Sequence, residues 1–202
     1  TAAFARIRVD RGEGRVFLKP PRGPRPDEDM AEYLLCDRGF VPTISLAVEA
    51  NIARRIGYAD LPPAEDTDFA IRLFNAGIRF VMADAPGAVW RDTASPARSS
   101  ASRNAESVRL WLERMQPAMT RRAWHGARGW AYAKLVRHQS LTRALGLYFN
   151  AALRGCYRPR LALVILLQII LSDAGYRRLA DTAIGRLRVG LREKPGRTLP
   201  AC

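Results

Sequence analysis

Apolar and polar residues alternate in the first stretch of the chain. Ala5, Ile7 and Val9 are apolar, and an arginine or aspartate follows each of them. An alternation with a period of two is typical of a half-buried strand. A Gly-Glu-Gly turn comes next, so residues 15–19 are predicted to return as a second strand. Residues 20–26 hold four prolines and are predicted to form a surface loop.

Helical and strand patterns then follow one another. We predict a short helix over residues 29–36, a buried strand over the apolar run Thr43–Val48, and a helix over Glu49–Ile56 that Gly57 ends. A further helix is predicted to begin near Glu65, because its apolar residues recur at helical spacing before a terminal glycine: Phe69, Ala70, Leu73, Phe74 and Gly77. Ile78–Met82 reads as a short strand.

From residue 101 onward the pattern is helical. Val108, Trp111, Leu112 and Met115 form an apolar stripe of the kind that packs into a core. Leu161–Leu171 is almost wholly apolar, but a helix of this length spans about 17 Å, against about 30 Å for the hydrocarbon of a bilayer. We therefore expect a buried helix or a shallow membrane-inserted segment.

The end of the chain predicts an amphipathic helix with a basic face, over residues 176–191. Upstream, Trp124, Trp130 and Tyr132 lie among basic residues. Amphipathic aromatics beside basic residues suit a membrane interface or a nucleic-acid surface. The alternative is a helix docked on the core, whose basic face is simply solvated.

Composition adds a strong charge bias. The chain has 202 residues, 48% of them hydrophobic, and 33 basic against 19 acidic residues give a net charge of +14. Such a charge favours anionic partners. The three cysteines include no Cys-x-x-Cys pair, so neither a disulfide framework nor a zinc site is indicated, and a reducing compartment is expected. Because Thr1 is not Met and strand-like sequence follows at once, we expect the chain to begin inside a domain.

Three carboxylates, Glu65, Asp66 and Asp68, open the helix that ends at Gly77. Acidic residues at a helix N-terminus meet the positive end of the helix dipole, and capping alone would account for them. The extended segment 62–64 before them and the strand after the helix favour a second interpretation, in which the carboxylates face a ligand cleft beside a sheet. Asp68 and Arg72 are four residues apart and are predicted to pair.

The string EDTDFAIRLFNAG, followed by IRFVMADAPGAVWR, resembles the C-terminal half of a family 2 glycosyltransferase catalytic domain, which has the GT-A fold. The family pattern is an apolar strand, a helix, a GFDE loop, the motif EDxDxxxRxxxxG and a strand. Here GYAD stands in the place of the GFDE loop. The resemblance covers residues 29–98.

The resemblance implies an α/β fold. Residues 1–98 would be the C-terminal part of a GT-A-type, Rossmann-like mixed sheet with flanking helices. Residues 99–202 would form a basic α-helical region, for which association with a membrane is one interpretation. The implied function is transfer of a sugar, with inversion, from a nucleotide-sugar donor to a saccharide or lipid-linked acceptor in bacterial cell-surface polysaccharide biosynthesis. The expected location is the cytoplasm, at the inner face of the plasma membrane.

Residue roles follow by the same resemblance. Asp66 would be the catalytic base, and Glu65 would position the acceptor or tune Asp66. Asp68 and Arg72, which are candidates for substrate binding, would hold the helix and its loop in place. Trp90 and Arg91 are the other substrate-binding candidates, since an arginine suits a departing diphosphate. The histidine that many relatives carry after this pair is missing.

A divalent metal, Mg²⁺ or Mn²⁺, is the implied cofactor, held in the family by a DxD motif. No convincing DxD occurs here, because Asp27-Glu28-Asp29 follows a proline loop and not a buried strand. We therefore predict no metal ligand in this chain, expect the ligands in a donor-binding half N-terminal to it, and expect the chain alone to be inactive.

Two other functions stay open. A non-catalytic basic module that binds anionic lipid or nucleic acid would explain the charge but not the ED-x-D constellation. The absence of a helix-turn-helix or RNP-like pattern argues against nucleic acid. A catalytically silent homologue of the glycosyltransferases would explain the missing histidine.

Overall fold

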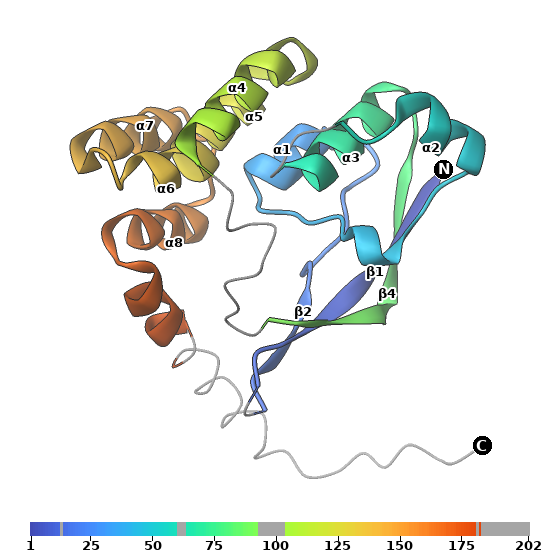
Figure 1. Ribbon diagram of the computed structural model, residues 1–202, viewed down its shortest axis with the longest axis horizontal. Coiled ribbons are helices and arrows are strands. Elements are labelled where there is room, and N and C mark those ends of the chain that lie inside the picture. The colour runs from blue at the N-terminus through green and yellow to red at the C-terminus, as the bar shows by residue number, and fades with distance from the viewer. Residues whose placement is uncertain (13, 60–63, 93–103, 181, 183–202) are drawn as a thin grey trace.

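The computed structural model describes residues 1–12, 14–59, 64–92, 104–180 and 182. It is a mixed α/β structure in which a small sheet stands beside a group of helices (Figure 1). The strands are β1 Ala2–Asp10, β2 Val16–Lys19, β3 Leu46–Ala47 and β4 Phe80–Arg91. The helical elements are α1 Met30–Leu35, the 3₁₀ turn η1 Thr43–Ser45, α2 Ala50–Ile56, α3 Glu65–Asn75, α4 Ala105–Met115, the 3₁₀ turn η3 Gln116–Ala118, α5 Arg121–Ala127, the π-helical segment η4 Arg128–Tyr132, α6 Ala133–Val136, α7 Leu141–Leu153 and α8 Pro159–Ile170.

Strand β1 is the centre of the sheet. It pairs with β4 in parallel along its whole length, and with β2 and β3 in antiparallel orientation at its two ends. The sheet is therefore mixed, as predicted. The parallel pairing requires a crossover, and the segment that contains α1, α2 and α3 provides it.

The two faces of the sheet differ in burial. Phe4, Ile7 and Val9 of β1 are at most 2% exposed. Phe4 belongs to the core that the helices share, and Ile7 and Val9 lie together on one face at the other end of the strand. On the opposite face Arg8 lies in register with Leu18 of β2 and with Val89 of β4. Leu18 and Val89 are both exposed. At this end of the sheet the face with Ile7 and Val9 is therefore the covered one.

The covered face leads into a continuous hydrophobic core. It runs from β1 through α1 and α3 into α4, α5, α7 and α8. The stripe predicted from Val108 to Met115 is buried in it, as expected. Helix α1 connects the two parts of the chain, because it contacts α3 on one side and α5 on the other. The boundary placed at residue 98 stays a prediction.

The buried strand predicted over Thr43–Val48 is wrong. Only Leu46 and Ala47 pair with β1, and the preceding residues form the turn η1, in which Ile44 is 62% exposed. The side chain of Ser45 explains the early end of the pairing. Its hydroxyl donates to the carbonyl of Ala5 and so takes an acceptor on β1 from the backbone.

The predicted helix ends are confirmed. Asp29 caps α1 by accepting from the backbone N–H of Glu32, and Gly57 and Gly77 follow α2 and α3 with φ of 63° and 81°. The apolar run near residue 165 forms α8, which is buried on one side only. No helix among the described residues is long and apolar enough to cross a membrane. Of the predicted C-terminal amphipathic helix, residues 176–180 are helical, and most of the remainder lies outside the described residues.

Candidate active site

The N-terminus of α3 carries the three predicted carboxylates in its first turn. Ala64 is the cap residue and offers no side-chain oxygen, so the backbone N–H groups of this turn are left to the acidic residues and to solvent. The carboxylates do not share one environment. Asp68 is fully buried, whereas Glu65 and Asp66 are half-buried.

Asp68 is held by cations on both sides. Its Oδ2 lies 2.6 Å from Nη2 of Arg72, and its Oδ1 accepts from Arg114 at 3.0 Å and from the indole of Trp111 at 3.3 Å. The last two residues belong to α4. The predicted pairing of Asp68 with Arg72 is thus confirmed, and Asp68 also ties α3 to the helical region.

Arg72 links α3 to the end of α2. Its Nη1 donates to the carbonyl of Ile56 at 2.6 Å, and its Nη2 donates to the carbonyl of Gly57 at 2.9 Å. These bonds satisfy the C-terminal carbonyls of α2 and fix the start of the following loop. Their contacts give Asp68 and Arg72 the positioning role that the sequence suggests, while direct contact with a substrate stays a prediction.

Asp66 has a different partner. The hydroxyl of Thr43 donates to its Oδ1, and no cation among the described residues pairs with it. Burial raises the pKa of Asp66, the charge of Glu65 raises it further, and the bond from Thr43 lowers it. A carboxylate with a raised pKa binds a proton more readily, as a general base must.

Glu65 and Tyr58 complete this cluster. The Oε2 of Glu65 is buried without a hydrogen-bond partner among the described residues. The ring of Tyr58 stacks on Phe69, with the centroids 4.2 Å apart, and its hydroxyl is bonded to Thr43. Burial, aided by the charges of Asp66 and Glu65, raises the pKa of Tyr58. The phenol therefore keeps its proton and can act as a donor.

Trp90 belongs to a neighbouring aromatic and basic cluster. Its ring stacks on Phe40 at 6.1 Å, and Nζ of Lys19 lies 4.2 Å from the Phe40 centroid and 5.8 Å from the Trp90 centroid. Burial, with Arg38 and Arg11 nearby, lowers the pKa of Lys19 to about 8, although Asp92 opposes the shift. The predicted Arg91 is exposed at the end of β4.

The segment 40–43 connects the two clusters, because Phe40 contacts Trp90 and Thr43 contacts Asp66. Sequence reasoning missed Thr43, Phe40 and Lys19 as site residues. Thr43 was assigned to a buried strand, which hid its role. Among the residues of the two clusters that were not predicted, only Tyr58 lies in a sequence motif, the GYAD loop, that could have pointed to the site. Residues 60–63, which include the aspartate that ends the GYAD loop, lie outside the described residues.

The residues present do not make a metal site. No group of three or more His, Cys, Asp or Glu side chains among the described residues is placed to hold an ion. Asp29 caps α1, and Glu28 pairs with Arg22 at 2.6 Å, so the Asp-Glu-Asp segment is engaged within the protein. The implied Mg²⁺ or Mn²⁺ stays a prediction.

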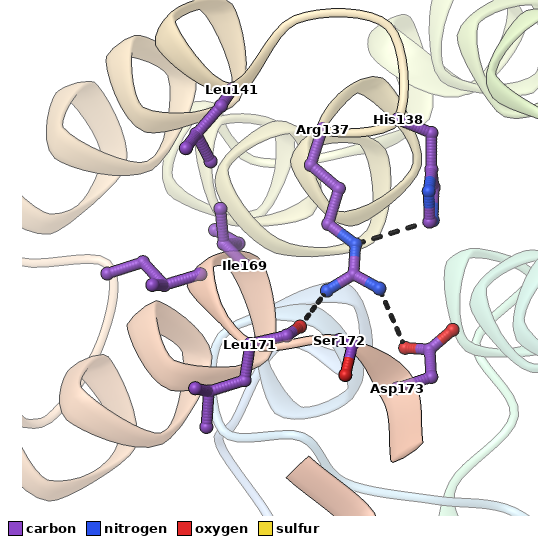
Figure 2. A pocket seen from close by; sticks show the side chains of 8 residues that line it. Arg137, His138, Leu141, Ile169, Leu171, Ser172 and Asp173 are labelled. Carbon is purple, nitrogen blue, oxygen red and sulfur yellow. Dashed lines mark hydrogen bonds and ion pairs between the residues drawn. The ribbon is translucent and has the colours of Figure 1, made fainter. Parts of the chain in front are cut away.

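A cavity of about 330 Å³ lies in the helical region, away from α3 (Figure 2). Arg137 dominates it, and its guanidinium donates to the carbonyls of Gln168 and Leu171 and to the carboxylate of Asp173. This arginine caps the C-terminal end of α8. Its charge and its donors are used within the protein, which argues for a structural role.

Comparison of the chain with protein-family models, with curated proteins and with solved structures found no match.

Proposed function

We propose that this chain is the acceptor-side part of a family 2 glycosyltransferase with a GT-A-type fold. The supporting observation is the contrast within the first turn of α3. Asp68 is neutralised by Arg72 and Arg114, whereas Asp66 and Glu65 have no cation partner among the described residues. Two adjacent carboxylates without cations, in a partly buried position, are costly unless a substrate uses them.

In this proposal Asp66 takes the proton of the acceptor hydroxyl as its oxygen attacks the anomeric carbon of the donor. Thr43 orients the carboxylate through its bond to Oδ1. Glu65 accepts a hydrogen bond from a second acceptor hydroxyl, since its Oε2 has no partner among the described residues. Tyr58 offers an aromatic face and a donor at the rim.

The leaving diphosphate would meet the cluster of Lys19, Trp90 and Arg91. An anion near Lys19 favours its charged form, so binding of a diphosphate would raise its pKa from about 8. Arg91 can add a bidentate contact. The exposed sheet face that carries Leu18, Val81 and Val89 would be covered by the donor-binding half.

The experiment has two steps. The first is to read the coding sequence upstream of Thr1, where we expect a strand that ends in DxD after a βαβ pattern. The second is Asp66→Asn in the protein that contains both halves. A lost general base lowers kcat about 10²- to 10⁴-fold, measured as release of nucleoside diphosphate in the presence of acceptor.

Asp84→Asn is the matched control, because this carboxylate is 87% exposed on β4 and meets only Arg6 at 3.4 Å. We expect it to keep full activity. Equal loss in both variants, or full activity of Asp66→Asn, would contradict the assignment. An upstream sequence without a donor site would instead favour the basic binding module, recognised by salt-sensitive retention on heparin or anionic vesicles that Asp66→Asn leaves unchanged.

A further inference from the structure

A second cavity, of about 340 Å³, lies between α5 and α7 in the helical region. Its volume is within the range, roughly 300–1,000 Å³, of small-molecule sites. Side chains from α5, from the start of η4 and from one face of α7 line it: His125, Arg128, Arg143, Gly146, Leu147 and Asn150. The lining is basic and polar on one side and aliphatic only at Leu147.

The charge at this pocket is not neutralised. Neither Arg128 nor Arg143 has an ion pair among the described residues, and Arg121 and Arg154 stand close enough to His125 to lower its pKa, after burial. The sequence explains the imbalance, because no acidic residue occurs between Glu113 and Asp173. No local carboxylate is therefore available to pair with these arginines.

The contacts that hold the arginines fix their direction without supplying negative charge. The guanidinium of Arg128 lies over the ring of Trp124, 4.3 Å from its centroid. Nη2 of Arg143 donates to the hydroxyl of Tyr132 at 3.4 Å. Two guanidinium groups held by neutral partners keep several N–H donors for a ligand.

Gly146 keeps the floor of the pocket open. A Cβ at this position would meet no atom within 4 Å, so packing does not require glycine there. Gly129, in contrast, has Ala151 and Tyr157 within 3.0 Å of such an atom. A glycine inside a helix lowers helix stability. Gly146 is exposed, and the space in front of it belongs to the same cavity and leaves room for a bound group.

The local backbone is also unusual. Arg128 begins η4, a π-helical segment inserted between α5 and α6. Such segments are rare and frequently occur at functional sites, because they turn side chains away from the regular helical position.

We propose that this pocket binds a phosphate group, between Arg128 and Arg143 and in front of Gly146. Guanidinium groups bind phosphate oxygens with paired N–H donors, and His125 and Asn150 add polar contacts at the edge. The phosphate belongs either to a soluble phosphate ester or to the head group of a lipid. This site is separate from the carboxylates of α3, and it does not depend on the sugar transfer proposed above.

The test uses the 202-residue chain and two probes: inorganic pyrophosphate, followed by calorimetry, and phosphatidylcholine vesicles with or without phosphatidic acid, followed by co-sedimentation. We expect Arg143→Gln to weaken binding about tenfold or more, since a charged hydrogen bond is lost. Arg160→Gln is the control, because it removes one exposed charge from α8 outside the pocket. It should change binding less than about twofold.

Gly146→Leu gives a variant that leaves every charge in place. The Cβ of the new side chain would meet no atom within 4 Å, and leucine favours a helix more than glycine does. Circular dichroism verifies that the variant is folded, so a loss of binding cannot come from unfolding or from net charge. The pKa of His125, followed by NMR, should rise when pyrophosphate binds, because an anion favours the charged ring.

The two probes separate the two sources of phosphate. Pyrophosphate binding that Arg143→Gln and Gly146→Leu weaken supports a soluble ligand, and vesicle binding alone with the same dependence supports a lipid head group. The proposal is overturned if neither probe binds, if Arg160→Gln lowers binding as much as Arg143→Gln, or if Gly146→Leu binds as well as the parent chain.

Discussion

The sheet region and the helical region each contain one charged residue that is paired with opposite charge and one that is not. In α3, Asp68 is buried against Arg72 and Arg114, while Asp66 and Glu65 are left without a cation. In the helices, Arg137 is 7% exposed and bonded to carbonyls and to Asp173, while Arg143 lines a cavity with Arg128 and has no carboxylate partner among the described residues. In each region the charge that has counterions holds helices together, and the charge without a counterion among the described residues is the one that we propose for ligand binding.

The largest expected effect is that of Asp68→Asn. Asp68 is fully buried, but the side chains of Arg72 and Arg114 are 28% and 49% exposed. Because solvent reaches both guanidinium groups, we expect a loss of up to about 3 kcal/mol, the lower end of the range for a broken buried ion pair. Urea unfolding followed by circular dichroism measures it. Asp66→Asn is the matched control in the same helical turn and should cost far less. Equal losses of unfolding free energy in the two variants would show that Asp66 and Asp68 contribute alike to stability.

The second comparison is between two arginines. Arg137→Gln removes the donors that cap the end of α8 and should lower the free energy of unfolding by about 1.5–3 kcal/mol. Arg143→Gln should leave that free energy unchanged, because among the described residues its guanidinium bonds only to the hydroxyl of Tyr132, at 3.4 Å. Thermal unfolding of the two variants tests this. A destabilised Arg143→Gln would give Arg143 a structural role.

Gly146→Ala should stabilise the chain. The position lies inside α7 and has open space in front of it, so the gain is the difference in helix propensity, about 1 kcal/mol. Gly129→Ala serves as the opposite control, since a Cβ there would lie 2.4 Å from that of Ala151. It should destabilise. A loss of stability in Gly146→Ala would mean that the pocket floor is packed.

The smallest effect is the pH dependence of Asp66→Asn. Because the folded state raises the pKa of Asp66, ionisation of this carboxyl costs stability in the fold. At a pH below the ordinary pKa of Asp, the asparagine variant should therefore have the same free energy of unfolding as the parent chain. As the pH rises through the raised pKa, the variant should become the more stable of the two. Unfolding free energies measured along a pH series check the sign. A variant that becomes weaker as the pH rises would show that the charged form is stabilised.

Much of the local structure could be predicted from the sequence. The alternation around Ile7 predicted β1, the spacing of Phe69 and Leu73 predicted α3, and the glycines at 57 and 77 predicted the helix ends. These features depend on near neighbours and on backbone conformation, which the chain itself encodes. The strand prediction for Thr43–Val48 was wrong because it also used only the local pattern, which fits a strand. The hydrogen bond from Ser45 to a carbonyl of β1 joins residues far apart in the sequence.

The sequence by itself determined the first turn of α3, the pair Asp68–Arg72 and the excess of positive charge. Only the tertiary structure decided which charges are neutralised. Arg114 reaches Asp68 from a helix 46 residues away, and Thr43 reaches Asp66 from 23 residues away. Local spacing cannot encode such contacts, because packing of the intervening elements against a common core creates them. The same packing gives Asp66 and Arg143 no counterion in the part of the chain that the structure describes.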